Sequence, residues 1–294
     1  MAENTALDVI DRQEWLEPIA DTLKETISGI YESAGAAGQE IKNALHGTWL
    51  GHPLHPVLTD VPIGAWTVAL VLDVMDGSSP SRSVARGAKI AVGVGLAGAA
   101  GAAITGLTDW QDTDGRARRV GLVHGLLNVT ATLLYTTSFL KRGGSSRGGA
   151  RGFAYAGFAV MCAAAWLGGD LVYGEQIGVN HAAGADAPPD FTPVLPATEL
   201  QEAQMRRVEV NGVRVLLVRK DGKIHAMAET CSHLGGPLSE GKFDGECVEC
   251  PWHGSRFAVE DGSVVDGPAT HPQPCYETRV HDGQIEIRAG KQAS

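Results

Sequence analysis

Residues 231–257 read CSHLGGPLSEGKFDGECVECPWHGSRF, and this stretch contains two short Cys–His motifs. The first is Cys231-Ser-His233 and the second is Cys250-Pro-Trp-His253, so each motif supplies one thiol and one imidazole. Thiolate and imidazole side chains are typical ligands of zinc and of iron–sulfur centres. The sequence therefore predicts a metal centre held by two loops.

Two kinds of metal centre could use these four side chains. Zinc sites more often place two cysteines first and two histidines later. An iron–sulfur cluster in which two cysteines bind one iron and two histidines bind the other fits the alternation of Cys and His in this chain. The iron–sulfur interpretation is favoured, and a chance spacing of four buried residues is the least favoured, because glycines and hairpin signals surround both motifs.

The motifs lie in a C-terminal segment that has the pattern of successive β-hairpins. Short runs of alternating apolar and polar residues are separated by pairs of turn residues, which are Asn211-Gly212, Asp221-Gly222, Asp261-Gly262 and Asp282-Gly283. We predict an all-β domain over residues 195–294. The proline-rich segment 177–194 is predicted to be a linker.

This C-terminal segment resembles the Rieske [2Fe–2S] family, whose ligand loops read Cys-x-His and Cys-x-x-His. The likeness extends over Cys231-Ser-His-Leu-Gly-Gly-Pro237 and Cys250-Pro-Trp-His-Gly-Ser-Arg-Phe257. The resemblance implies that Cys231 and Cys250 bind one iron and that His233 and His253 bind the other. It also implies that Pro268 belongs to a proline loop that shields the cluster.

The resemblance further indicates which residues surround the cluster. Respiratory-type members of the family join the loops by a disulfide, but Gly236 and Trp252 stand at those places, so packing alone must hold the loops. Ser255 is expected to donate a hydrogen bond to a cluster sulfide, whereas Phe257 stands where high-potential members offer a tyrosine hydroxyl. Fewer donors stabilise the reduced cluster less, so we predict a potential toward the low end of the Rieske range of about −150 to +300 mV.

Four apolar stretches precede the β domain. Residues 90–108, 120–140 and 152–169 run for 19, 21 and 18 residues without a charged side chain, which is about the length that a bilayer core demands. The first stretch, residues 54–75, is interrupted by Asp60 and Asp73. We predict an α-helical four-span membrane bundle over residues 51–176, and a buried soluble bundle is the alternative. This region resembles a family of predicted four-helix bacterial membrane proteins of unassigned function.

Residues 1–50 are predicted to be an acidic amphipathic helical segment. Trp15, Ile19, Leu23, Ile27 and Ile30 recur at helical spacing and predict one buried face. The opposite face is acidic and would be repelled by anionic lipid. We therefore expect a helix that packs on protein and not on a membrane surface.

Four histidines flank the predicted spans, namely His52, His55, His124 and His181. An up-down-up-down bundle would gather them at one membrane face. Ionisable groups at membrane depth are costly unless they are paired or liganded. One interpretation is a second metal site, for haem b or for a metal ion, and the other is that these histidines cap helix ends and contact headgroups.

Several functions are disfavoured by the sequence. The formal net charge of −10 argues against a nucleic-acid partner. No glycine-rich dinucleotide fingerprint is found. Rieske oxygenases resemble this chain only in the cluster domain, and the mononuclear iron motif of their catalytic domain is not found here. We therefore assign no catalytic residue.

These features predict a multi-domain, membrane-anchored Rieske protein that carries single electrons between a reductase, a quinol or a haem and an acceptor protein. A redox or metal sensor, and a membrane quinol-linked or haem-linked oxidoreductase regulated by the cluster, are the alternatives. We expect a multi-pass protein of the inner cell membrane, in contact with lipid. The charges of the loops favour termini outside the cell. However, the cluster is normally loaded in the cytoplasm, so we place the Rieske domain and the termini there.

Overall fold

In a computed structural model of the protein, residues 5–143, 147–185 and 188–290 are described. They form two compact units, of which the first contains the chain up to residue 38 and residues 54–176, and the second contains residues 39–53 and the chain from residue 177 onward. Residues 1–4, 144–146, 186–187 and 291–294 of the predicted segments lie outside the described residues.

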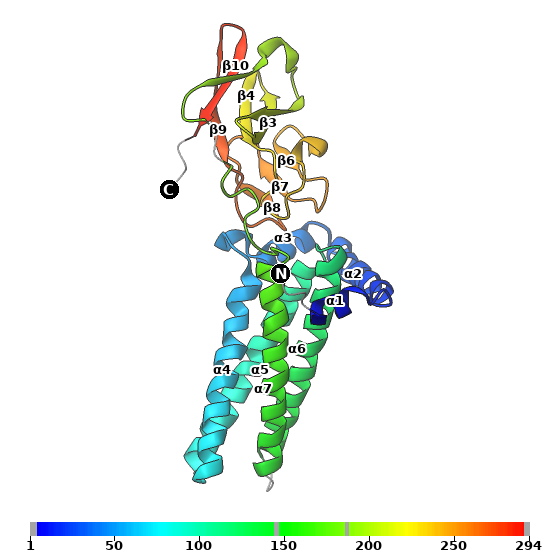
Figure 1. The fold of residues 1–294 in the computed structure, drawn as a ribbon, viewed down its shortest axis with the longest axis vertical. Helices are drawn as coiled ribbons and strands as arrows, with labels where there is room; N and C mark the ends of the chain where they lie inside the picture. The colour runs from blue at the N-terminus through cyan, green and yellow to red at the C-terminus, as the bar shows by residue number, and fades with distance from the viewer. Residues whose placement is uncertain (1–4, 144–146, 186–187, 291–294) are drawn as a thin grey trace. The chain divides into compact units, whose positions relative to one another are not determined.

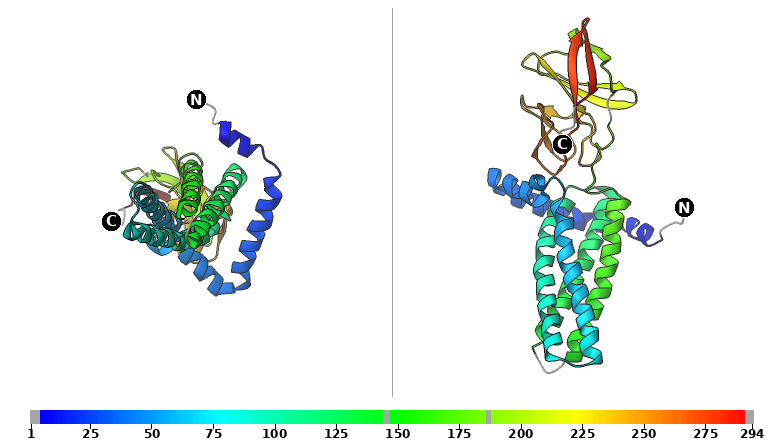
Figure 2. Two further views of the ribbon diagram at one scale, coloured as in Figure 1. Left: turned by 90° about the horizontal axis from the view of Figure 1, so that it is seen from below. Right: turned by 90° about the vertical axis from the view of Figure 1, so that its left-hand side faces the viewer.

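Four long helices form most of the first unit (Figures 1 and 2). They are α4 (Leu54–Ser78), α5 (Arg82–Trp110), α6 (Gly115–Lys141) and α7 (Arg147–Tyr173). All four are long and apolar enough to cross a membrane. Helix α4 packs along α5, and α6 packs along α7, so the bundle consists of two helical hairpins. The predicted helical bundle is confirmed.

Two of the three aspartates of α4, Asp73 and Asp76, are buried in ion pairs, whereas Asp60 is exposed. Asp73, which interrupts the first apolar stretch, is 1% exposed and accepts two hydrogen bonds from Arg142, at 2.7 and 2.5 Å. Asp76 is 3% exposed and accepts a hydrogen bond from Arg151 at 2.9 Å. Pairing removes the cost of burying an isolated carboxylate, which explains how an apolar helix carries these charges.

The N-terminal segment forms α1 (Thr5–Asp11), α2 (Leu16–Ser33) and α3 (Gly35–His46) instead of one helix. Its predicted apolar face is partly wrong. Leu23 and Ile27 are half-buried against the bundle as expected, but Trp15, Ile19 and Ile30 are exposed. The residues that α2 buries fully are Leu16 and Ala20.

Ion pairs with α6 account for this rotation of α2. Arg118 pairs with Asp21, and Arg119 pairs with Glu17 and with Asp11 of α1. These contacts hold the acidic side of α2 toward α6, which places the neighbouring row of residues in the core. The spacing of apolar residues in the sequence could not by itself show which of two adjacent rows of residues on α2 is buried.

The strands of the second unit form two antiparallel sheets. The larger sheet has the order β1-β10-β9-β4-β3-β2 and the smaller has the order β5-β6-β7-β8. Strands β1 and β2, at opposite edges of the larger sheet, contact each other, so this sheet curls toward a barrel. The strands are β1 (Thr192–Pro196), β2 (Met205–Val210), β3 (Val213–Lys220), β4 (Lys223–Ala228), β5 (Lys242–Phe243), β6 (Cys247–Glu249), β7 (Arg256–Ala258), β8 (Val264–Asp266), β9 (Cys275–His281) and β10 (Gln284–Ala289).

Three of the predicted turn pairs join adjacent strands of the larger sheet. Asn211-Gly212, Asp221-Gly222 and Asp282-Gly283 connect β2 to β3, β3 to β4 and β9 to β10, and both residues of each pair have positive φ. Two-residue turns of this kind match the twist of an antiparallel hairpin. The predicted all-β fold is confirmed.

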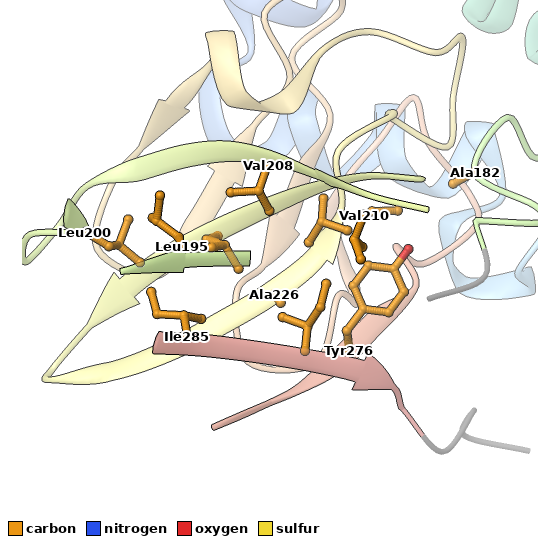
Figure 3. Close-up of a cluster of buried hydrophobic side chains, with 12 residues drawn as sticks. Ala182, Leu195, Leu200, Val208, Val210, Ala226, Tyr276 and Ile285 are labelled. Carbon is orange, nitrogen blue, oxygen red and sulfur yellow. The ribbon is translucent and has the colours of Figure 1, made fainter. Parts of the chain in front are cut away.

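Two clusters of buried apolar side chains stabilise the second unit. The first lies among the strands of the larger sheet and includes Leu195, Val208 and Ile285 (Figure 3). The second joins the two sheets, because it contains Met227 of β4 together with Phe257 of β7, and it also contains both motif cysteines. The two ligand loops therefore rest on a packed core.

Candidate metal centre

The first Cys–His motif forms a closed loop of residues 231–236, directly after the end of β4. The Cys231 N–H donates to the carbonyl of Gly236 at 2.8 Å, and the Gly235 N–H donates to the carbonyl of Cys231 at 2.9 Å. The loop lies between β4 and a short 3-10 helix at Leu238–Glu240.

The second motif, between β6 and β7, forms a loop with the same two bonds. The Cys250 N–H donates to the carbonyl of Ser255 at 2.8 Å, and the Gly254 N–H donates to the carbonyl of Cys250 at 3.1 Å. The closing glycines of the two loops, Gly235 and Gly254, have φ of +79° and +73°. This left-handed conformation suits glycine because it has no Cβ. The two motifs thus build two equivalent loops.

The two motif thiols are buried and lie together. Cys231 is 1% exposed and Cys250 is 3% exposed, and their sulfur atoms share a hydrogen bond. The bond from Cys231, with the backbone N–H groups of Trp252 and His253, lowers the pKa of the Cys250 thiol to about 7. The bond to Cys250, together with burial, raises the pKa of the Cys231 thiol. A depressed thiol pKa favours the thiolate, which is the metal-binding form.

The two motif imidazoles lie beside each other at a more exposed level. The ring centroids of His233 and His253 are 5.0 Å apart and the rings are perpendicular. Both histidines are half-buried, whereas the neighbouring Trp252 is 57% exposed. The site therefore has an inner pair of sulfur donors and an outer pair of nitrogen donors.

The first loop approaches the second through a residue that has no side chain. A Cβ on Gly236 would lie 2.8 Å from Cys250 Sγ and 3.1 Å from the Trp252 ring. All five cysteines of the chain are free thiols, so no disulfide joins the loops. Packing holds the two loops together.

A third loop, residues 267–271, crosses both ligand loops and contains the buried Pro268. The Ala269 N–H donates to the hydroxyl oxygen of Ser255 at 2.9 Å, and the Ser232 hydroxyl donates to the carbonyl of His271 at 2.7 Å. Ser255 is thus an acceptor for the proline loop, and its own hydroxyl hydrogen is still available. Phe257 is fully buried in the core beneath the second loop.

One residue that supports the proline loop was not predicted from the sequence. The Asn43 side chain on α3 donates to Asp266 Oδ1 at 2.9 Å, and the Gly267 N–H donates to Asn43 Oδ1, also at 2.9 Å. His46, which lies on the same helix as Asn43, is buried and packs beside Gly267 of the loop. No local pattern could have revealed this contact, because more than 200 residues separate Asn43 from the loop that it supports.

Replacement of Asn43 by alanine is expected to weaken the proline loop. The change removes the hydrogen bonds that join Asn43 to Asp266 and to the Gly267 amide, and it leaves that amide without this acceptor. We therefore expect the free energy of unfolding to fall by about 1–3 kcal/mol. The check is the denaturant midpoint for loss of the visible absorption of the loaded centre. Glu40→Ala, at an exposed position of the same helix, is the matched control, and equal midpoints for the two variants would contradict the prediction.

The structure divides the four histidines of the predicted second site between the two units. His55 and His124 belong to the bundle, where their Nδ1 atoms bond the carbonyls of Ala102 and Ala164 at 2.9 and 2.8 Å. His52 is exposed and belongs to the second unit. The backbone N–H of His181, also in that unit, donates to the carbonyl of Ser232 of the first ligand loop at 3.0 Å.

Comparison with known proteins matches both parts of the chain. Residues 190–277 match the family described as "Rieske [2Fe-2S] domain", and residues 51–181 match the family described as "Predicted membrane protein (DUF2231)". Ferredoxin CarAc of Metapseudomonas resinovorans is 35% identical over 99 residues, which are 33% of this chain and 92% of that ferredoxin. The chain belongs to the Rieske [2Fe–2S] family.

Other Rieske proteins resemble the same part of the chain. Apoptosis-inducing factor 3 of Mus musculus is 37% identical over 95 residues, which are 32% of this chain, and the match spans only 16% of that protein's length. The solved ferredoxin of carbazole 1,9a-dioxygenase from Nocardioides aromaticivorans IC177 is 27% identical, with a TM-score of 0.33 over 34% of this chain and 98% of that one.

The Rieske domain implies a [2Fe–2S] cluster. The family predicted from the Cys–His motifs is therefore confirmed, as is the preceding membrane family. These comparisons give no support for a haem.

Proposed function

We propose that this protein is a membrane-anchored electron carrier, whose Rieske domain passes single electrons between a reductase and an acceptor protein. The observation that carries the proposal is the pair of equivalent loops, which present two buried thiols and two half-exposed imidazoles. The likeness to nearly the whole of a ferredoxin supports it. Ferredoxins of this kind are named as subunits of dioxygenases, so an oxygenase is one class of acceptor.

The four motif residues would hold the cluster, with Cys231 and Cys250 on one iron and His233 and His253 on the other. The paired arrangement of the donors supports this assignment over a single zinc ion. Within residues 5–143, 147–185 and 188–290, no three His, Cys, Asp or Glu side chains converge as a single-ion site would require. When bound, the cluster supplies a one-electron couple.

The rest of the site controls water and access. The thiols lie in the core, which excludes water from the sulfur side. The imidazoles and the exposed Trp252 form the outer edge, so a partner protein would dock there and exchange electrons through His233 or His253. The Ser255 hydroxyl, held in place by Ala269, would donate to a cluster sulfide.

Stopped-flow reoxidation tests the carrier function. Reduced full-length protein in detergent would be mixed with an oxidised Rieske oxygenase, and the cluster absorption followed. A carrier is reoxidised faster than the oxygenase turns over, and Trp252→Ala lowers the second-order rate constant while the midpoint potential stays unchanged. Val280→Ala, at an exposed apolar position on β9, is the control. Slow reoxidation by every oxidised oxygenase tried would contradict the carrier function.

A sensor is the second candidate, and the contact of Asn43 with the proline loop favours it. This contact connects the cluster site to the N-terminal segment within the second unit. A sensor would show different hydrogen exchange in residues 39–50 between the oxidised and reduced proteins. A carrier would show the same exchange in both states.

The Phe257→Tyr variant is expected to raise the midpoint potential of the cluster by about 60 mV. A hydrogen bond to a charged group contributes about 1.5 kcal/mol, and about 59 mV corresponds to 1.4 kcal/mol for one electron. A redox titration of the cluster absorption measures the shift. Phe243→Tyr, on β5 of the same sheet, is the control. An unchanged potential in Phe257→Tyr would rule out the role given to this position.

We place the bundle in the cell membrane with the Rieske domain in the cytoplasm. In a Cys162→Ser background, we expect Ser79→Cys, in the α4–α5 connection, to react with an impermeant thiol reagent in intact cells. Lys223→Cys, at an exposed position of β4, is expected to react only after lysis. The reverse labelling pattern would place the Rieske domain outside.

A further inference from the structure

The two helical hairpins of the bundle share a sequence pattern. A shift of 69 residues carries positions of α4 onto positions of α6, and it pairs His55 with His124, Trp66 with Tyr135, and Asp73 with Arg142. A shift of 62 residues carries α5 onto α7, and it pairs Gly95 with Gly157, Ala102 with Ala164, and Gly106 with Gly168. The buried positions recur as well, since Pro62, Trp66 and Ala69 on α4 correspond to Ala131, Tyr135 and Ser138 on α6.

Equivalent residues of the two hairpins meet in the bundle interior. The rings of Trp66 and Tyr135 are stacked, with centroids 4.0 Å apart and planes inclined by 13°. Asp73 and Arg142 form the two-bond ion pair described above. These contacts indicate a pseudo-two-fold axis between the hairpins.

The third pair, His55 and His124, has the same environment in both copies. Each Nδ1 atom bonds a carbonyl on the second helix of its own hairpin, at Ala102 or Ala164. A carbonyl accepts only, so each Nδ1 carries the hydrogen and each Nε2 is left with a lone pair.

The ring contacts repeat in the same way. A Cβ on Gly106 would lie 2.7 Å from His55 Cε1, and a Cβ on Gly168 would lie 3.1 Å from His124 Cε1. Each glycine follows the carbonyl that accepts the bond from Nδ1 by one helical turn, so each hairpin holds its ring in the same cradle. Asn128 Nδ2 lies 3.0 Å from His124 Nε2, as expected when that nitrogen is an acceptor.

We propose that His55 and His124 are the two axial ligands of a haem iron in the bundle. Metal-binding histidines commonly donate their other ring N–H to a backbone carbonyl, as both do here. A metal ion held by protein alone needs about three or four ligands, and no such group is found among the described residues. Haem iron takes four ligands from its macrocycle and needs only axial ligands from the protein. On binding, Asn128 would release His124 Nε2.

The experiment measures haem in the full-length protein. The protein would be produced in cells supplied with a haem precursor, purified in detergent, and assayed by pyridine haemochrome and by its reduced-minus-oxidised spectrum. We expect one haem per chain with the low-spin signal of two imidazoles. His55→Asn and His124→Asn keep an amide donor for the backbone carbonyl but remove Nε2, and each is expected to lose at least nine-tenths of the haem while the Rieske absorption stays unchanged. His52→Asn is the matched control and should keep its haem.

If the asparagine variants do not accumulate in cells, titration of the wild-type protein with haemin tests the proposal instead. Purified wild-type protein should take up haemin to saturation at one per chain and become low-spin. Uptake that does not saturate, or haem that survives replacement of both His55 and His124, would overturn the proposal. Wild-type protein that neither carries haem nor binds haemin would overturn it equally.

Discussion

Gly236→Ala is expected to remove more than nine-tenths of the cluster from the purified protein. The added Cβ would lie 2.8 Å from Cys250 Sγ and 3.1 Å from the Trp252 ring, so the proposed ligand sulfur or the whole second loop must move. Protein interiors are close-packed, and the thiols lie in a packed core, so the loops cannot separate without loss of core contacts. Iron and sulfide analysis, with the visible circular dichroism of the cluster, measures the effect.

Gly254→Ala is the control for this prediction. Gly254 has positive φ, so alanine is strained there by about 1–2 kcal/mol, but its Cβ would meet no atom within 4 Å. We expect this variant to be less stable and still to hold the cluster. Equal cluster content in the two variants would show that close approach of the loops at Gly236 is not a requirement for cluster binding.

The second large effect is expected at the ion pair of the bundle. Asp73→Asn or Arg142→Gln is expected to destabilise the bundle by about 3–5 kcal/mol, because each leaves an uncompensated charge at a side chain that is 2% or 7% exposed in the native pair. Since the two positions are equivalent in the repeated hairpins, the exchange of Asp73→Arg with Arg142→Asp should recover most of the loss. Thermal unfolding in detergent, followed by the fraction that remains monodisperse, measures these differences.

A more exposed pair provides the matched control. Arg116 and Glu175 are 3.2 Å apart with side chains 38% and 23% exposed, so removal of either partner should cost about 1 kcal/mol or less. If the double exchange is no more stable than the single variants, then the two positions are not equivalent. The stacking of Trp66 on Tyr135 would then be the one direct contact that supports a repeated hairpin.

Local patterns were sufficient for the fold class and the family. The Cys–His spacings identified the two ligand loops, the Asn-Gly and Asp-Gly pairs identified three hairpins, and the length of the apolar stretches identified the four long helices. Each of these signals acts within about 25 residues, because turn conformation, strand alternation and helix length are properties of a continuous segment.

Contacts between distant segments were decided only by the tertiary structure. The support of the proline loop by Asn43, the pairing of Asp73 with Arg142 and the rotation of α2 toward Leu16 and Ala20 each depend on which surfaces pack together. The repeat of the hairpins was also not recognised from the sequence. It preserves contacts across the pseudo-two-fold axis more than it preserves residue identity. Local patterns specify which elements form, whereas burial and charge pairing between elements select the partner of each side chain.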